Sequence, residues 1–593
     1  MDAEHTTIAD PVVTEIVRGA LGSIQLEMEA LIERTAMSPF IREKKDFHTA
    51  LFDRDARLIA GKSLPIASNI IEPILERYPA ATMRPGDIYW YNDCYASKGA
   101  VSHTSDQVFI TPVFAGDILF AYAHSWAHFN DIGGMRPGSL SPDCTEIFQE
   151  GIIIPPVRLA REGVVSDDLL NLFYRNCRFP EMVRGDTRAS LAAIRLGEKR
   201  LQELIARFGT KALQAAFDAL IDRTREAARA KLRALVPDGD YRFTETVDGD
   251  GQGSGAFAIR YHLSVENGRT VLDLTGSDDQ VKGPLNFLMS QTTPRLALTS
   301  YLVGADPATP VNQGALDLID EVRLRPGSIV QPRFPAPLGL RGVTMMRNLS
   351  GLLGLMNVAT NGQAMAAHSA YVIWYLRGRT DDGRIYLMSD GVGVGYGARP
   401  FADGNDAIYL VAQENYPVEF LDAVYPVRVR EYAINRDTGG PGRWRGGCGM
   451  VRELEVLAEE GMVSVRIDSV DNPPWGVAGG HSARSGRCVI NPGRNDERVL
   501  NPLSDGNLVR RGDIIRVETG GGGGWGHPFD REPERVLADV LGGFVSRDSA
   551  ERDYGVVLHD DGTAVDLTAT QAWRRQRPEA ALFHRNLYRA SLD

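Results

Sequence analysis

The chain has 593 residues, of which 43% are hydrophobic and 24% charged, with a formal net charge of −12, as expected for a folded protein of two or more domains. The negative charge argues against nucleic-acid binding, and no apolar run approaches the ~20 residues that span a membrane. The acidic N-terminus does not resemble a secretory signal, and the five cysteines form no CxxC pair, so we expect a cytoplasmic protein with reduced thiols that binds neither nucleic acid nor membranes.

The first elements in chain order are one long helix and two pairs of strands. Apolar residues at three- and four-residue spacing predict a helix that begins after Asp10, an N-cap followed by Pro11, and ends near Ser38. Short apolar segments separated by tight turns predict two antiparallel strand pairs, 49–53 with 58–60 and 106–114 with 118–124.

A second helical block and a glycine-rich region follow. The block is predicted from Asp186 to Leu235, with Gly209 as a break. Beyond it, strands are predicted within 241–276, 425–432 and 462–467, and helices at 294–302, 349–372 and, as the last one, 533–545. We therefore predict an α+β fold, mixed and multi-domain, with extensive antiparallel β-structure and long helices. Its regions are an N-terminal metal-site region (1–240), a middle α/β region (241–380) and a glycine-rich, β-rich C-terminal region with the last helix (381–593).

His103, Asp106, His128 and Asp131 are the residues that best predict a site. Imidazoles and carboxylates are the usual ligands of a catalytic divalent metal, and these four lie within 29 residues of a chain that has only 11 His. If 106–114 and 118–124 pair antiparallel, the ends that carry these side chains meet. The alternative is a hydrogen-bonded polar turn, in which His and Asp are also common. His124 is a weaker candidate ligand, and a role in the core or in supporting the ligands is favoured.

Other segments give no comparable indication of chemistry. Asp46 follows the basic run 42–45 (REKK), and the residues alone predict a solvated turn there. The run 520–524 (GGGGG) lacks the Gly-Lys-Ser/Thr that would complete a phosphate-binding loop, so a flexible or closely packed turn is favoured. No Gly-x-Ser-x-Gly elbow supports Ser/His/Asp catalysis.

Several motifs together resemble the hydantoinase B family, which includes metal-containing subunits of N-methylhydantoinases and caprolactamase, the C-terminal half of 5-oxoprolinase, and subunits of acetone and acetophenone carboxylase. The motifs cover nearly the whole chain: 42–47 before 50–53, 84–87 with 92–93, 131–139, 146–156, 417–419 before 425–426, 442–447 before 452–455, 520–528, and 553–557. The sequence departs from the family pattern at Cys94, where Pro is usual, and in 102–106 (SHTSD), which is closer to the carboxylase-like branch.

The resemblance assigns roles residue by residue. It implies that Asp46, His103, Asp106 and His128 bind one divalent metal, for which His and carboxylate ligands suit Zn, Mn or Fe. It also makes Asp131 a carboxylate that either supports the metal ligands from behind or acts in the active site, and Asp131 and His128 are the predicted catalytic residues. Asp131 would orient or deprotonate a water that the metal activates.

The resemblance further implies a hetero-oligomer with a hydantoinase A-type ATP-binding subunit. That partner would use ATP to phosphorylate the carbonyl of a small cyclic amide or ketone, and the activated species would pass to the metal site. We expect the metal-dependent subunit of an ATP-dependent hydrolase of hydantoin-, lactam- or oxoproline-type rings. Two alternatives remain: a subunit of an ATP-dependent ketone carboxylase, and a non-catalytic scaffold with a structural metal.

Overall fold

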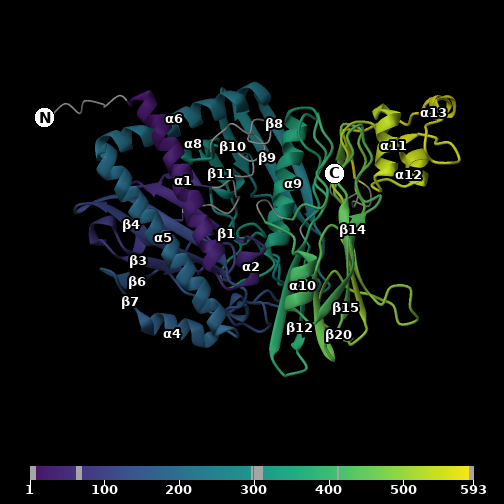
Figure 1. Cartoon of the computed structure of the whole chain (residues 1–593). Helices are drawn as coiled ribbons and strands as arrows, with labels where there is room; N and C mark the ends of the chain where they lie inside the picture. Colours follow the sequence, from purple (N-terminus) through teal and green to yellow (C-terminus); the bar gives the residue numbers. More distant parts are fainter. Residues whose placement is uncertain are drawn as a thin grey trace.

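A computed structural model describes residues 9–61, 70–295, 298, 311–370, 372–409 and 413–585. It confirms the predicted α+β class: long helices accompany several sheets, in which nearly all neighbouring strands run antiparallel. In Figure 1 the N-terminal helices and the largest sheet lie on one side of the molecule and the later strands on the other. Among the helices described, none has both the length and the apolar character needed to cross a bilayer.

The largest sheet carries the predicted strand pairs at its centre. Its strand order is β2 (Leu58–Gly61), β1 (Phe47–Asp53), β5 (Ile118–His128), β4 (Asp106–Ala115), β3 (Ile88–Tyr91), β6 (Val157–Arg161) and β7 (Val164–Val165). The pairs β1–β2 and β4–β5 are antiparallel, as predicted. Strands β4 and β5 are buried along nearly their whole length because helices pack against one face of the sheet and later parts of the chain cover the other.

The N-terminal helices follow the predicted pattern. Helix α1 (Pro11–Thr35) is capped by the Asp10 side chain, which accepts hydrogen bonds from two backbone N–H groups, and the short α2 (Pro39–Arg42) begins after Ser38. The predicted second block is two helices, α5 (Pro180–Phe208) and α6 (Thr210–Leu235), separated at Gly209, whose φ is +79°. Helices α1 and α5 share one apolar core with the sheet. The smaller helices α3 (Glu72–Arg77) and α4 (Asp167–Asn176) and the 3-10 turns η1 (Ala80–Thr82) and η2 (Ile147–Glu150) lie in the connections.

The middle of the chain forms a four-stranded sheet covered by a buried helix. The sheet order is β11 (Glu321–Arg323), β10 (Arg269–Asp273), β9 (Phe257–Glu266) and β8 (Gly239–Val247), and the short α8 (Gln313–Leu316) precedes β11. Helix α9 packs on this sheet, and a Cβ atom at Gly351 or Gly354 would overlap the rings of Tyr261 and Phe243. Small residues therefore let the helix approach the strands closely.

The prediction of a helix over 349–372 is wrong at both ends, because α9 spans Arg341–Ala359. The helix stops where Asn361 and Gly362 adopt left-handed backbone conformations, with φ of 50° and 83°. Strand β12 begins at Val372. The helix predicted over 294–302 falls largely outside the described residues.

The C-terminal part is built from two larger sheets and one pair of short strands. One sheet has the order β13 (Ile385–Val392), β12 (Val372–Arg379), β16 (Glu460–Arg466) and β20 (Leu503–Arg510). The other has the order β14 (Val427–Asn435), β15 (Gly449–Val456), β21 (Ile514–Glu518), β18 (Arg487–Ile490) and β19 (Arg498–Val499), and β17 (Gly476–Val477) pairs with β22 (Phe583–His584). The strands predicted at 425–432 and 462–467 are β14 and β16. The three-region division stays a prediction, although β12, from the predicted middle region, pairs with β16 of the last one.

The chain does not have its last helix at 533–545. Helix α11 (Pro533–Leu541) is followed by α12 (Arg547–Tyr554) and α13 (Leu567–Arg574), which begin at the side-chain caps Ser546 and Asp566. Two further short elements are α10 (Val418–Val424) and the 3-10 turn η3 (Pro528–Asp530).

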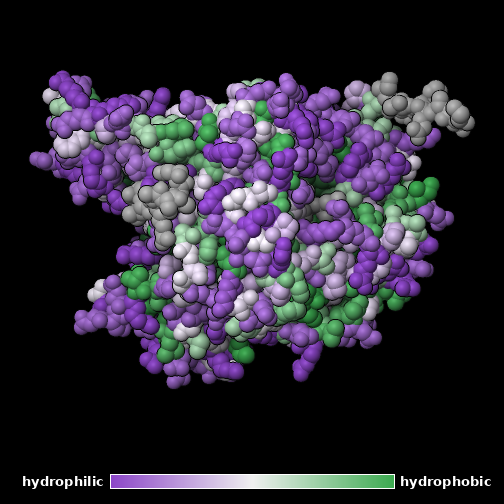
Figure 2. Space-filling model, turned by 180° about the vertical axis from the view of Figure 1, so that it is seen from behind, coloured by the Kyte–Doolittle hydropathy of each residue, from purple (hydrophilic) through white to green (hydrophobic). Residues whose placement is uncertain are grey.

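The glycine run 520–524 is closely packed, as favoured from the sequence. A Cβ atom on Gly521, Gly522 or Gly523 would lie within 2.1 Å of backbone atoms of other segments. Only glycine permits such an approach, so the run packs tightly against other segments and leaves no loop free for a phosphate. On the face seen in Figure 2, hydrophobic residues are interspersed among hydrophilic ones instead of forming one large patch.

Candidate metal centre

Three of the predicted side chains converge at the ends of β4 and β5. Asp106 is the first residue of β4, His128 is the last of β5, and the two are directly paired across the strands. His103 lies in the turn before β4. Its Nε2 is 2.7 Å from Asp106 Oδ1 and 3.1 Å from His128 Nδ1, and His128 Nδ1 is 3.4 Å from the same carboxylate oxygen. The antiparallel pairing thus brings the strand ends together, as the sequence predicted.

The geometry and burial of these three residues fit a divalent metal. Ligands at ~2.1 Å from a tetrahedral ion lie about 3.4 Å from one another; two of the separations here are 3.1 and 3.4 Å, and the third, 2.7 Å, would have to widen. His103, Asp106 and His128 are buried, and they form the one group of three such donors, among the residues described, that could hold an ion. Asp106 Oδ2 and His103 Nδ1 are buried without a hydrogen-bond partner in the described structure. The nitrogen of His103 that faces the site is Nε2, so Asp106 Oδ2 is the orphaned acceptor that an ion or a water at the site would satisfy.

The protonation states are those that a metal needs. Burial lowers the pKa of His103 to about 3, with the Arg341 charge acting in the same direction. For Asp106 burial opposes ionisation, but the interaction with His103, a hydrogen bond from His128 and the charge of Arg341 hold the pKa of the carboxyl well below its ordinary value. At neutral pH the site therefore offers a neutral imidazole and a carboxylate, the forms that coordinate metal ions.

Asp46 borders the same cavity. It lies directly before β1, and its backbone carbonyl accepts a hydrogen bond from the His128 N–H at 3.0 Å. Burial raises the pKa of its carboxyl to about 6; the Asp106 charge adds to this, whereas His128, Arg341 and a hydrogen bond from Gln413 oppose it. The structure thus brings Asp46 beside the three-residue group, and metal coordination by Asp46 stays a proposal.

The cavity is small and is lined by residues from distant segments. Its volume is about 40 Å³, room for an ion and a few waters but far below the ~300–1,000 Å³ of a typical small-molecule site. Besides the four residues above, it is lined by Phe40, Trp126, Leu140, Arg341, Met345, Ile373, Tyr409 and Gln413. As the described side chains lie, a whole cyclic substrate does not fit in this volume beside an ion.

Asp131 does not line this cavity. It is fully buried, and its carboxylate accepts hydrogen bonds from the N–H groups of Gly133, Gly138 and Arg178 and from Arg178 Nη1, at 2.9–3.0 Å. All these donors belong to the loop after β5 or to the segment between α4 and α5. The catalytic role of Asp131 stays a prediction from the resemblance, and the contacts favour a structural role.

Replacing Asp131 with alanine is expected to loosen this loop while metal binding persists. The change leaves the N–H groups of Gly133, Gly138 and Arg178 without an acceptor and removes the carboxylate that pairs with the Arg178 guanidinium, which costs about 2–4 kcal/mol of folding stability. Hydrogen exchange should show faster exchange of the Gly133 and Gly138 amides, with the metal content unchanged. A variant that lost turnover but kept native exchange rates and stability would favour the catalytic role instead.

His124 occupies the core, as favoured from the sequence. It lies within β5 and is fully buried, with its ring centroid 6.0 Å from that of His48 and 6.1 Å from that of Phe52. It does not belong to the group that could hold a metal. The residue type and the four-residue spacing to His128 could have suggested a shared helix, but both are strand residues.

Sequence reasoning missed Arg341 and Glu150. Arg341 begins α9 and lines the cavity, and it escaped notice because the helix was predicted to begin at Leu349. Glu150 is fully buried, and its Oε1 accepts hydrogen bonds of 2.7 Å from the N–H groups of Leu338 and Gly339. Burial raises the pKa of Glu150 to about 8. Glu150 thus fixes the turn that leads into α9 and so places Arg341.

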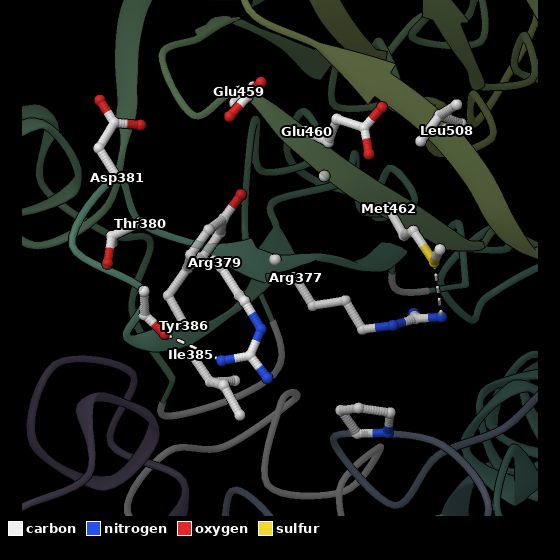
Figure 3. Close-up of a pocket in the computed structure, with 14 residues that line it drawn as sticks. Arg377, Arg379, Thr380, Asp381, Ile385, Tyr386, Glu459, Glu460, Met462 and Leu508 are labelled. Carbon is white, nitrogen blue, oxygen red and sulfur yellow. Dashed lines mark hydrogen bonds between the residues drawn. The ribbon is translucent and has the colours of Figure 1, made fainter.

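A larger hollow lies at the ends of β12, β13 and β16 (Figure 3). Its volume is about 890 Å³, and Figure 3 shows Arg377 reaching toward Met462 while Asp381, Glu459 and Glu460 lie along another side. None of the predicted site residues lines it, and no group of metal ligands, among the described residues, lies in it. The candidate chemistry therefore belongs to the small buried cavity.

Comparison with known proteins agrees with this geometry. The family model for Hydantoinase B/oxoprolinase matches residues 10–528. The beta subunit of caprolactamase from Pseudomonas jessenii is 30% identical over 585 residues, covering 95% of this chain and 99% of that protein. The crystal structure of the ATP-dependent caprolactamase from the same organism superposes with a TM-score of 0.84 at 27% identity, over 96% of this chain and 100% of the other.

A nucleotide-free acetone carboxylase structure superposes equally well, with a TM-score of 0.84 over 96% of this chain and 83% of that one. At 20% identity this likeness supports the fold alone. The family match, in contrast, covers most of the chain and includes every candidate metal ligand. The chain with the buried His103, Asp106 and His128 group therefore belongs to the Hydantoinase B/oxoprolinase family.

Proposed function

We propose that this chain is the metal-binding subunit of an ATP-dependent hydrolase that opens a small cyclic amide. A partner subunit of the hydantoinase A type would bind ATP and phosphorylate the ring carbonyl. The family and the similar caprolactamase beta subunit support this assignment, because that relative's enzyme is ATP-dependent and acts on a lactam. The observation that carries the proposal is the convergence of three donor atoms in one buried cavity.

The residues divide the work as follows. His103, Asp106 and His128 would hold the ion, with Asp46 as the fourth ligand. A bound divalent ion of the Zn, Mn or Fe type would supply a water whose pKa falls from 15.7 to about 7. The apolar side chains of Phe40, Leu140 and Met345 would exclude bulk water, which strengthens the interaction of charged groups inside the cavity.

The motif 102–106 favours a second candidate, the subunit of an ATP-dependent ketone carboxylase, because SHTSD is closer to the carboxylase-like branch. Both functions use the same ligands, so the metal site alone does not choose between them. The two candidate functions differ in their second substrate, which is water for the hydrolase and bicarbonate for the carboxylase.

Turnover of a lactam, hydantoin or 5-oxoproline by the purified complex is expected to consume ATP and to proceed without bicarbonate. The measurement is ADP release together with the ring-opened product, in buffer freed of CO2 and then with bicarbonate added. Omitting the ATP-binding partner or ATP should abolish the reaction. ATP consumption that strictly requires bicarbonate would reject the hydrolase in favour of the carboxylase, and turnover by this chain alone would reject the two-subunit model.

A further inference from the structure

Arg341 places a buried positive charge beside the candidate metal ligands. It is the first residue of α9, is 7% exposed and lines the small cavity. Its Nε donates a 2.8 Å hydrogen bond to Ser102 Oγ, and its Nη2 lies 3.6 Å from Asp106 Oδ2. The guanidinium is therefore fixed from one side by the turn that also carries His103.

Arg341 changes the net charge of the cavity when a divalent ion is bound. The described lining of the cavity contains two carboxylates, Asp46 and Asp106, and one permanent cation, Arg341. With a divalent ion and neutral imidazoles, the sum of +2, +1 and −2 leaves one net positive charge, whereas without Arg341 the sum is zero. Because the cavity is buried, an uncompensated charge there attracts a counter-ion strongly.

The remaining donors of Arg341 suit an oxyanion. A guanidinium has five N–H donors in a planar fork that matches phosphate and carboxylate oxygens. Apart from the bond to Ser102, no hydrogen bond from this guanidinium goes to a described residue. The 19-residue helix α9 begins at the same point, with no side-chain cap, and adds the positive end of its dipole.

We propose that Arg341 binds an oxyanion group of the substrate next to the metal ion. The inference rests on the proposed function and extends it, since it gives the site a subsite for a charged oxygen group. Two sources share this chemistry: the phosphoryl group placed on the carbonyl by the ATP-binding partner, and bicarbonate. The first belongs to the hydrolase and the second to the carboxylase, so the preferred oxyanion also distinguishes the two functions.

The test uses the full chain loaded with Mn²⁺, without ATP or partner, and inorganic phosphate or bicarbonate as the probe. Binding is measured by calorimetry and by paramagnetic broadening of the ³¹P or ¹³C resonance, on samples whose metal content is known. Phosphate is expected to bind near the metal, and Arg341→Gln is expected to weaken it about 10- to 100-fold at equal metal content. Arg341→Lys should lose less, because it keeps the charge but not the fork.

Two further variants test the position of the Arg341 guanidinium and control for the loss of a positive charge. Ser102→Ala removes the acceptor that aims the guanidinium but keeps its charge, so an intermediate loss is expected. Arg269→Gln removes the same charge from an exposed arginine that pairs with Glu321 and should leave phosphate binding unchanged. If Arg341→Gln fails to retain metal, Arg341→Lys and Ser102→Ala carry the test.

Phosphate affinity equal to that of the original chain in the metal-loaded Arg341 and Ser102 variants would overturn the proposal. Bicarbonate binding with no phosphate binding would keep the subsite but assign it to the carboxylase. Since no step of this measurement needs turnover, phosphate binding at Arg341 in a complex that opens no cyclic amide would contradict the proposed function alone.

Discussion

Replacing His128 with alanine should release the metal ion and abolish turnover while the chain stays folded. His128 Nδ1 lies 3.1 Å from His103 Nε2 and 3.4 Å from Asp106 Oδ1, so it completes the only described group of three donors. Loss of a direct ligand should lower metal affinity by more than about 100-fold, the upper range for partners that only support a ligand. Elemental analysis, circular dichroism and ATP-dependent turnover with the partner subunit measure the three parts of this result.

His124→Phe is the matched control, because His124 lies on the same strand and is equally buried but is not among the candidate ligands. This variant should keep its metal. The experiment also separates a catalytic from a structural ion. If His128→Ala lost its metal and unfolded, or kept full turnover, the scaffold alternative would gain and the catalytic assignment would fail.

Asp390→Asn should cost the protein about 3–5 kcal/mol of stability, the largest effect expected outside the metal site. Asp390 Oδ1 lies 3.0 Å from Lys44 Nζ and Oδ2 lies 2.8 Å from Arg452 Nη1, and all three side chains are 0% exposed. Asparagine would leave two buried cations without their shared counter-ion. Lys44 Nζ also lies 4.1 Å from the centre of the Tyr416 ring, which cannot replace a carboxylate.

Urea unfolding followed by circular dichroism measures this loss, and the metal content reports on Asp46, two residues beyond Lys44. The control is Asp381→Asn, because Asp381 pairs with Arg511 at the surface, where its side chain is 70% exposed, and such pairs contribute about 0–1 kcal/mol. Equal unfolding midpoints for the two variants would contradict a stabilising role for the buried network.

Local sequence patterns were sufficient to predict elements whose contacts join segments close along the chain. The apolar segments 106–114 and 118–124, joined by a short turn, predicted an antiparallel pair, and that pairing by itself places Asp106 opposite His128. The cap at Asp10 and the break at Gly209 likewise act within a few residues. These elements follow from the sequence because their hydrogen bonds join segments that are close along the chain.

The basic run before Asp46 is a segment whose environment could not be predicted from the neighbouring residues. The sequence around Lys44 suggests a solvated side chain, yet Lys44 is completely buried and pairs there with Asp390. This partner lies 346 residues further along the chain, so no local pattern reveals it. The residues alone therefore gave Asp46 no special role, and only the family resemblance brought it forward. Arg341 was missed for a related reason: α9 is buried on nearly all sides, so it lacks the one-sided apolar pattern that marks where a surface helix begins.

The sequence by itself determined the family, the strand pair and three converging donors, since these depend on local spacing and on motifs. Only the tertiary structure decided that Asp131 ties a loop, that Asp46 and Arg341 border the donors, and that the cavity is small. Those outcomes depend on which charged residues from distant segments are buried next to one another. Burial strengthens the interaction between such charges, and the spacing of residues along the chain does not show which of them will meet.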